Sequence, residues 1–275
     1  MRKSIFFGEI RHLEGACSGE YETTFAALRR LGIEGFQLSD RDIAHVGEER
    51  LLQAMQRQGM DADVIHTVVP LLSEEDAVFR AAVSKAMETI SLLRRFSCTR
   101  LMIVALPHTD VKGEGDRERA MARMIEGLSQ IVGAANGQGI DIYIENYSIP
   151  ILPYSSVSDI EQITDALPAV KYTFDVGNFI CVGENPHRAY ERLRSRVSLL
   201  HLKNFATSPD GQGFLCADGH CVKGLPFDRG DFDMKRFLRT CTTDGGRILP
   251  VIEHNAKASL EEIARSAALT DRLLT

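Results

Sequence analysis

The sequence predicts an α/β protein built as a single (β/α)8 TIM barrel that spans residues 1–275. Eight short apolar stretches alternate with eight helical stretches, and strict alternation implies parallel strands joined by right-handed crossovers. The length of 275 residues suits one barrel, which typically runs to about 250 residues. An open doubly wound sheet is the competing architecture. It calls for a glycine-rich phosphate loop, and the chain contains neither GxGxxG nor GxxxxGK(S/T).

The expected strands are short apolar stretches, and the stretch 99–106 is nearly all apolar, as a strand covered on both faces should be. The strands are expected at 3–8, 33–38, 60–69, 99–106, 141–145, 170–175, 197–203 and 248–253. The helices are expected at 21–31, 48–58, 74–96, 116–138, 158–167, 186–195, 231–242 and 259–273. A long segment rich in glycine and aspartate, residues 204–230, is expected to be a loop after the seventh strand.

Local signals fix several helix ends. Gly32 and Gly59 follow the first two helical stretches, where a glycine commonly ends a helix. Ser73 is expected to cap the third helix. Asn185 precedes Pro186, a pairing that places a capping side chain before a proline at the first helical position.

Composition narrows the class of protein. The net charge of −6 gives no overall attraction to nucleic acid or to an anionic membrane. No apolar run approaches the roughly 20 residues of a membrane span, and Gly8-Glu9 interrupts the short apolar start, so we expect no signal peptide. The six cysteines form no CxxC pair, which is typical of reduced thiols. We therefore expect a cytoplasmic protein that binds neither nucleic acid nor membrane.

Four late strands each carry a metal-competent side chain at or near the carboxyl end: Glu145, Asp175, His201 and Glu253. A single carboxylate in such a place usually caps a helix or forms an ion pair. In a parallel barrel, however, all carboxyl ends share one face, so the four groups should converge. Three close carboxylates require a compensating cation. Three carboxylates and one imidazole without a thiolate favour Mn²⁺, Co²⁺ or Mg²⁺, with manganese preferred here.

The chain resembles the xylose-isomerase-like barrel superfamily, in its sugar-phosphate isomerase/epimerase branch. The resemblance runs the whole length and is most specific from Ile142 onward. The motifs that carry it are Ile144-Glu145-Asn146, Phe174-Asp175-Val176-Gly177-Asn178, His201-Leu202-Lys203-Asn204, Gly230-Asp231-Phe232-Asp233 and Val251-Ile252-Glu253-His254.

This resemblance implies a function and assigns roles to residues. It implies that Glu145, Asp175, His201 and Glu253 bind one divalent metal, and that both glutamates also transfer protons. The substrate class would be a keto sugar or a cyclic polyol ketone, a small carbohydrate. Relatives are often dimers or tetramers, so a homo-oligomer is compatible with the resemblance.

The implied chemistry is proton transfer next to a carbonyl. A metal bound to the carbonyl and a neighbouring hydroxyl would stabilise the enediolate as it forms. Carboxylates on opposite faces of the carbon can then remove a proton from one side and return one to the other. Use of one face alone would give aldose–ketose isomerisation or loss of water.

Other residues are expected to contact the substrate. His66 and His108 lie near the ends of the third and fourth strands. Lys203 lies two residues past His201 and should point to the same side of its strand. Asn178 stands where many of the family's epimerases carry a histidine. The segment 204–230 is predicted to cover the metal as a lid, with His220 as its substrate contact.

Three alternatives remain open. A dehydratase or lyase acting on a keto-polyol or keto-glycoside could use the same site. A barrel without activity is a further alternative. An apurinic-type endonuclease would use a cluster of three zinc ions, for which the available ligands are His66, His108, Glu145, Asp175, His201, Asp218 and His220. Asn178 stands where that cluster needs a histidine, and the 204–230 segment has few basic residues to follow a phosphate backbone.

Overall fold

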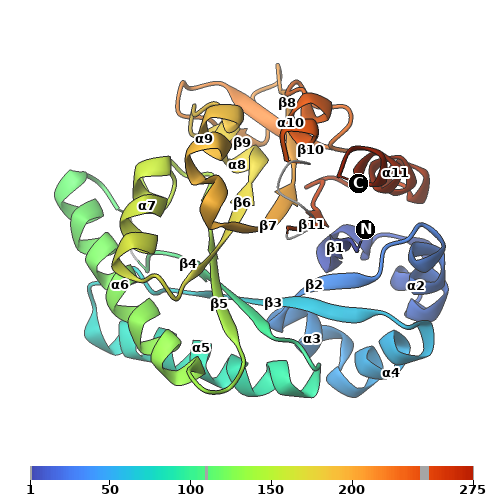
Figure 1. Ribbon diagram of the computed structural model, residues 1–275, viewed down its shortest axis with the longest axis horizontal. Helices are drawn as coiled ribbons and strands as arrows, with labels where there is room; N and C mark the ends of the chain where they lie inside the picture. The colour runs from blue at the N-terminus through green and yellow to red at the C-terminus, as the bar shows by residue number, and fades with distance from the viewer. Residues whose placement is uncertain (1, 109–110, 242–247, 275) are drawn as a thin grey trace.

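The computed structural model describes residues 2–108, 111–241 and 248–274, and it shows the predicted closed barrel (Figure 1). In this described part of the chain, the barrel strands follow the order β1-β11-β7-β6-β5-β4-β3-β2, and every pairing between neighbours is parallel. The helices lie outside the strands (Figure 1). The (β/α)8 fold predicted from the alternating pattern is therefore confirmed.

The barrel strands agree with the predicted stretches to within a few residues. They are β1 (Ser4–Phe6), β2 (Gly35–Ser39), β3 (Asp61–Val69), β4 (Arg100–Ala105), β5 (Asp141–Glu145), β6 (Lys171–Asp175), β7 (Val197–Leu202) and β11 (Leu249–Ile252).

The larger helices also match their predictions. They are α2 (Tyr21–Arg30), α4 (Glu48–Gln58), α5 (Asp76–Arg95), α6 (Glu114–Ala135), α7 (Val157–Ala166), α9 (Pro186–Leu193), α10 (Met234–Cys241) and α11 (Leu260–Leu274). Thr242, the expected end of one helix, lies outside the described residues. Short helices occupy several connections: η1 (Phe7–Ile10), α1 (Glu14–Cys17), α3 (Asp40–Val46), α8 (Val176–Cys181) and η2 (Arg194–Arg196). No described helix is both long and apolar enough to cross a bilayer.

One predicted helix cap is confirmed and one is wrong. The Asn185 side chain accepts hydrogen bonds from the backbone of His187 and Arg188 at the start of α9. Ser73, in contrast, does not cap α5, because the helix begins three residues later, with Glu75 at its N-cap position. The Ser73 hydroxyl instead accepts a hydrogen bond from the Glu75 backbone N–H at 3.1 Å, which closes a local turn just before the helix.

Strand register positions the late strand ends beside one another. Asp175 pairs with His201 across β6 and β7, and Val251 pairs with His201 across β7 and β11. Below them an apolar layer formed by Val64, Met102, Tyr143 and Leu199 fills the barrel interior. Such layers make the inside of a barrel a close-packed core, so the polar groups at the carboxyl ends of the strands lie against a rigid apolar layer.

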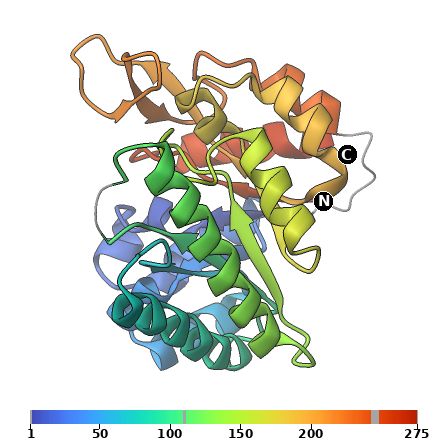
Figure 2. The same ribbon diagram turned by 90° about the vertical axis from the view of Figure 1, so that its left-hand side faces the viewer.

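The predicted loop 204–230 contains a small antiparallel sheet, so the prediction that the whole segment is a loop is wrong. Its strands are β8 (Asn204–Thr207), β9 (Phe214–Leu215) and β10 (Cys221–Leu225), in the order β8-β10-β9. Buried Phe205 and Val222 hold this sheet against Cys181 and Cys216. Gly213 serves the bend before β9, since its φ of +106° is one that glycine adopts without strain. Figure 2 shows the segment in orange, projecting at the upper left of the barrel.

Strand β10 lies against the backbone that follows Glu253. A Cβ atom added at Gly224 would lie 2.6 Å from the His254 carbonyl oxygen and would also collide with that of Asn255. We expect Gly224→Ala to push apart the sheet and the Glu253 segment, lowering both the midpoint of thermal unfolding and the metal affinity. Gly133→Ala on α6 is the control, because no atom of the described residues lies within 4 Å of its added Cβ. It should change stability by at most about 1 kcal/mol. Equal behaviour of the two variants in melting and metal titration would contradict this close contact.

Candidate active site

The buried side chains of Glu145, Asp175 and His201 meet at the carboxyl face of the barrel. Each comes from a different strand, namely β5, β6 and β7. One ligand atom from each lies within 4.8 Å of the others, which is close enough for the three residues to share a metal ion. The parallel strands bring them together, as their positions at the strand ends predict.

His201 presents one ring nitrogen to this cluster of carboxylates. Its Nε2 lies 2.8 Å from the Gln37 side-chain oxygen at the end of β2, so Nε2 carries the proton and donates it there. The opposite nitrogen, Nδ1, lies 3.1 Å from Glu145 Oε2, 3.2 Å from Glu253 Oε2 and 3.6 Å from Asp175 Oδ2. Gln37 therefore fixes the ring so that Nδ1 faces three carboxylates.

The cluster fits a divalent cation. His201 Nδ1 and Glu253 Oε2 are buried, yet neither has a partner with hydrogen-bond geometry among the described residues, although they lie at ion-pair distance. Unsatisfied buried atoms that converge in this way cost free energy unless another group binds them. Glu253 lies at the margin, outside the tight group of three. The donor set of carboxylate oxygens and one imidazole suits Mn²⁺, Mg²⁺ or Co²⁺.

Lys203 supplies a positive charge within the cluster. Its ammonium group lies 2.8 Å from Asp175 Oδ2, 2.7 Å from Glu253 Oε1 and 3.3 Å from Asn178 Oδ1. Lys203 thus points to the same side as His201, as predicted. The contacts with Asp175 and Asn178 are hydrogen bonds, and the contact with Glu253 is an ion pair. They favour the neutralisation of buried carboxylates over direct contact with a substrate.

The environment shifts the ionisation of these groups in different directions. Burial raises the pKa of Glu145, although the contact with His201 opposes the change. Burial also tends to raise the pKa of Glu253, but the charges and hydrogen bonds of Lys203 and His201 have the larger effect and lower this pKa to about 2. Burial alone would lower the pKa values of His201 and Lys203, but the carboxylates raise both well above their ordinary values.

Asn146 joins strands β5 and β6 next to the cluster. Its amide nitrogen donates to the Asp175 carbonyl at 2.9 Å, and its side-chain oxygen accepts from the Asp175 backbone N–H at 2.9 Å and from the Tyr172 hydroxyl at 2.7 Å. Asn178 in turn donates to the Asn146 carbonyl at 2.8 Å. Asp175 Oδ1 caps α8 by accepting from the Asn178 backbone at 2.9 Å, so its other oxygen faces the cluster.

The structure places the three predicted substrate-binding histidines differently. His66 lies within β3 rather than at its end, is buried, and has its ring centroid 5.0 Å from that of Phe6. His108 is exposed after β4. His220 is exposed in the β9–β10 turn, where it contacts Asp218 and not the cluster. Only His66 is brought close to the cluster, and the substrate contacts of all three stay predictions.

Glu9 is a candidate functional residue that the motifs do not single out. Its Oε1 accepts from the Asn255 backbone at 2.9 Å, while the buried Oε2 has no partner among the described residues. Burial and the charge of Glu253 raise its pKa to about 7. A cavity of about 550 Å³ lies between the two glutamates, lined by Phe6, Gly8, Glu9, Arg11, His12, Glu253, Asn255, Ala256 and Lys257. In the sequence, the one sign that Glu9 could lie at the active site is its position shortly after the first strand.

The closed parallel barrel, with a polar cluster at its carboxyl face, places this chain among the TIM-barrel proteins, and comparison with known proteins agrees. The chain belongs to the xylose isomerase-like TIM barrel family, whose model matches residues 25–269. A search of the curated proteins finds no match to this chain.

Solved structures with the same fold include three whose described chemistry is relevant. A xylose isomerase-like TIM barrel protein from Mycobacterium smegmatis in complex with magnesium is 18% identical, with a TM-score of 0.66 and coverage of 93% of this chain and 90% of that chain. The probable 3-DHS dehydratase AsbF from Bacillus anthracis is 14% identical, with a TM-score of 0.72 and coverage of 98% and 99%. The 3-keto-D-glucoside 4-epimerase YcjR from E. coli is 12% identical, with a TM-score of 0.69 and coverage of 92% and 94%. At these identities the likeness shows the shared fold alone.

Proposed function

We propose that this protein is a divalent-metal-dependent isomerase or epimerase that acts on a keto sugar or a cyclic polyol ketone. The observation that carries the proposal is the convergence of Glu145, Asp175 and His201, with Glu253 beside them, on one buried point. Family membership supports it, since the cluster occupies the carboxyl face where barrel enzymes hold their active sites.

Glu145, Asp175, His201 and Glu253 would hold the metal, and manganese is the ion we propose. When bound, the metal would supply Lewis-acid stabilisation of negative charge that develops on a substrate carbonyl oxygen. Gln37 keeps His201 Nδ1 directed at the cluster, and Lys203 offsets the charge of Asp175 and Glu253. Glu145 and Glu253 would each remove or return a proton at the carbon next to the carbonyl.

A dehydratase working at the same site is the second candidate. Elimination on one face needs only one carboxylate, which accepts the substrate proton and returns it to the departing hydroxyl group so that water leaves. The fold-level likeness to a probable 3-DHS dehydratase supports this alternative to the same degree as the likeness to an epimerase supports the first.

The geometry weighs against an apurinic-type endonuclease. Asp218 and His220 form a separate group with Cys216, and no described group joins them to Glu145. The side chain of Asn178 is an amide that contacts Lys203 and the Asn146 carbonyl, so this position supplies no imidazole ligand for zinc. The ligands required for a three-metal cluster are therefore not brought together.

Solvent proton exchange tests the proposed function. The full chain, loaded with Mn²⁺, is incubated in D₂O with a panel of ketoses, inososes and 3-keto-glycosides. We expect deuterium to enter one substrate next to its carbonyl, with inversion or isomerisation, and a chelator to abolish the exchange. Loss of water without inversion would instead support the dehydratase. Equal exchange in rigorously metal-free protein, or no exchange with any substrate, would overturn the proposal.

Glu9 provides a prediction about the substrate. Its unpaired Oε2 is a ready acceptor for a substrate hydroxyl in the adjoining cavity. Glu9→Gln replaces one acceptor by a donor without changing size, so KM should rise about tenfold or more, since a hydrogen bond to a charged group contributes about 1.5–3 kcal/mol. Metal content should stay unchanged. Glu14→Gln, at an exposed position on α1, is the control. Identical steady-state kinetics in the two variants would exclude Glu9 from substrate binding.

A further inference from the structure

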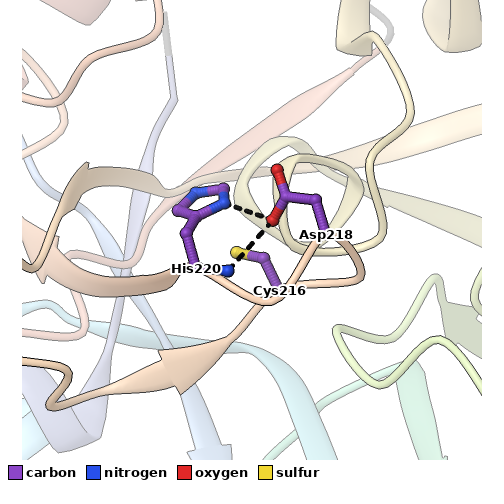
Figure 3. Close-up of side chains that lie close together, drawn as sticks. All are labelled: Cys216, Asp218 and His220. Carbon is purple, nitrogen blue, oxygen red and sulfur yellow. Dashed lines mark hydrogen bonds and ion pairs between the residues drawn. The ribbon is translucent and has the colours of Figure 1, made fainter.

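The turn from Cys216 to His220 brings three potential metal ligands together outside the barrel. The turn joins β9 to β10 and is closed by backbone hydrogen bonds from Cys216 to the His220 carbonyl at 2.8 Å and from Gly219 to the Cys216 carbonyl at 3.0 Å. Alternate residues of this turn, Cys216, Asp218 and His220, place their side chains on one side, as Figure 3 shows. The turn therefore brings together side chains at positions i, i+2 and i+4 of the sequence.

The converging atoms are chemically distinct from those of the barrel cluster. A thiol sulfur, a carboxylate oxygen and an imidazole nitrogen all lie within 4.8 Å of one another (Figure 3). Thiolate and imidazole ligands select zinc over the harder ions magnesium and manganese. Three protein ligands also leave one position of a tetrahedral site open.

A second thiol lies beside this group. Cys181, the last residue of α8, is fully buried, and Cys216 is 4% exposed; the two sulfurs pack in one small cluster with Phe205 and Val222. The Ala217 backbone N–H donates to the Cys181 carbonyl at 2.8 Å, which fixes the turn to the end of α8. Ligand atoms held by a preformed backbone lose less entropy when a metal binds.

We propose that Cys216, Asp218 and His220 form a zinc site, with the fourth position taken by water or by the Cys181 thiol. This inference does not depend on the proposed catalytic function, because the ligands and the preferred metal differ from those of the barrel cluster. Burial raises the pKa of the Cys216 thiol, so binding must displace a proton from sulfur.

The site would fasten the β8–β10 sheet to α8. That helix follows Asp175, whose side chain caps it and faces the barrel cluster. The zinc site would thus hold the sheet next to α8, which follows Asp175, one of the proposed manganese ligands. The connection between the two sites runs along α8 from Val176 to Ile180 and then through the Ala217–Cys181 hydrogen bond.

Cobalt titration of the full chain tests the proposal. The metal-free protein is kept reduced with a phosphine and titrated with Co²⁺, which reports thiolate ligation through a sulfur-to-cobalt charge-transfer absorption. We expect this absorption to saturate by about two equivalents, because the barrel cluster also binds Co²⁺, and to disappear when Zn²⁺ is added. Cys216→Ser should abolish it, and His220→Ala should weaken cobalt binding by tenfold or more.

Two variants provide the controls. His201→Ala removes a barrel ligand and should leave the charge-transfer absorption intact. Cys17→Ser removes an exposed thiol elsewhere and should also leave it intact. Cys181→Ser distinguishes the two candidates for the fourth ligand by the intensity of the absorption. The proposal is overturned if the reduced protein shows no such absorption or if Cys216→Ser retains it. Loss of two thiols on mild oxidation without any cobalt signal would indicate a Cys181–Cys216 disulfide pair instead.

Discussion

Replacing Glu253 or Glu145 by glutamine is expected to lower net turnover by about 10² to 10⁴, the usual contribution of a positioned acid or base. Glutamine keeps the size of the side chain and one carbonyl oxygen, so part of the metal affinity should remain. It removes the group that accepts the substrate proton. An epimerase that works on both faces of a carbon needs both carboxylates, and each variant should therefore fail in net conversion.

Proton exchange should separate the roles of the two glutamates. Removal and return of a proton on a single face needs one carboxylate, so one variant should still exchange the substrate proton with D₂O while the other does not. That pattern, measured by mass spectrometry of recovered substrate, would assign a face to each residue. A dehydratase would lose exchange and water release together in one variant only.

Glu88→Gln is the matched control for both substitutions, because Glu88 is exposed on α5, far in sequence from the strand ends. It should keep the wild-type rate and metal content. Wild-type rates in Glu145→Gln and Glu253→Gln, with metal still bound, would show that the glutamates do not transfer protons.

Replacing His201 by alanine or Asp175 by asparagine is expected to weaken binding of Mn²⁺ by one to several orders of magnitude. Loss of a group that merely orients a ligand typically costs 10- to 100-fold in metal affinity, and these changes remove or neutralise the ligand itself. Activity should fall in parallel and recover in part at high metal concentration for Asp175→Asn. Isothermal titration of the metal-free variants measures the change directly.

His45→Ala is the control for this pair, since His45 is exposed on α3. Gln37→Leu adds a graded test, because it removes the 2.8 Å contact that orients His201 while leaving every proposed ligand in place. We expect an intermediate loss of affinity. Unchanged manganese binding in His201→Ala would show that the convergent cluster is not a metal site, and that Lys203 alone compensates its carboxylates.

The repeating pattern of the sequence determined the fold. Apolar strand stretches alternate with helical stretches, and alternation leaves a parallel arrangement with crossovers as the consistent topology. Strand-end positions followed from the same pattern. Because parallel strands share one face at their carboxyl ends, the sequence predicts that Glu145, Asp175, His201 and Glu253 converge, and the structure places them together.

The segment 204–230 shows where local pattern reasoning fails. Glycine and aspartate are depleted in strands, so their abundance indicated a loop. Tertiary contacts override that preference: Val222 packs with Phe205, and Gly224 fits against the carbonyls of His254 and Asn255, where a larger residue would collide. A small sheet forms because its partners come from elsewhere in the chain.

The sequence by itself thus determined the barrel, the face that carries the cluster, and the chemical types of the converging groups. Only the tertiary structure decided that Gln37 orients His201 and that Lys203 binds both Asp175 and Glu253. It also decided that one Glu9 oxygen has no partner in the described part of the chain, and that Cys216, Asp218 and His220 form a group of their own. The physical reason is the range of the interactions. Periodicity and strand order are set by neighbours along the chain, whereas these contacts join residues from distant strands and turns, and the rotamers that complete them are chosen by packing and charge in three dimensions.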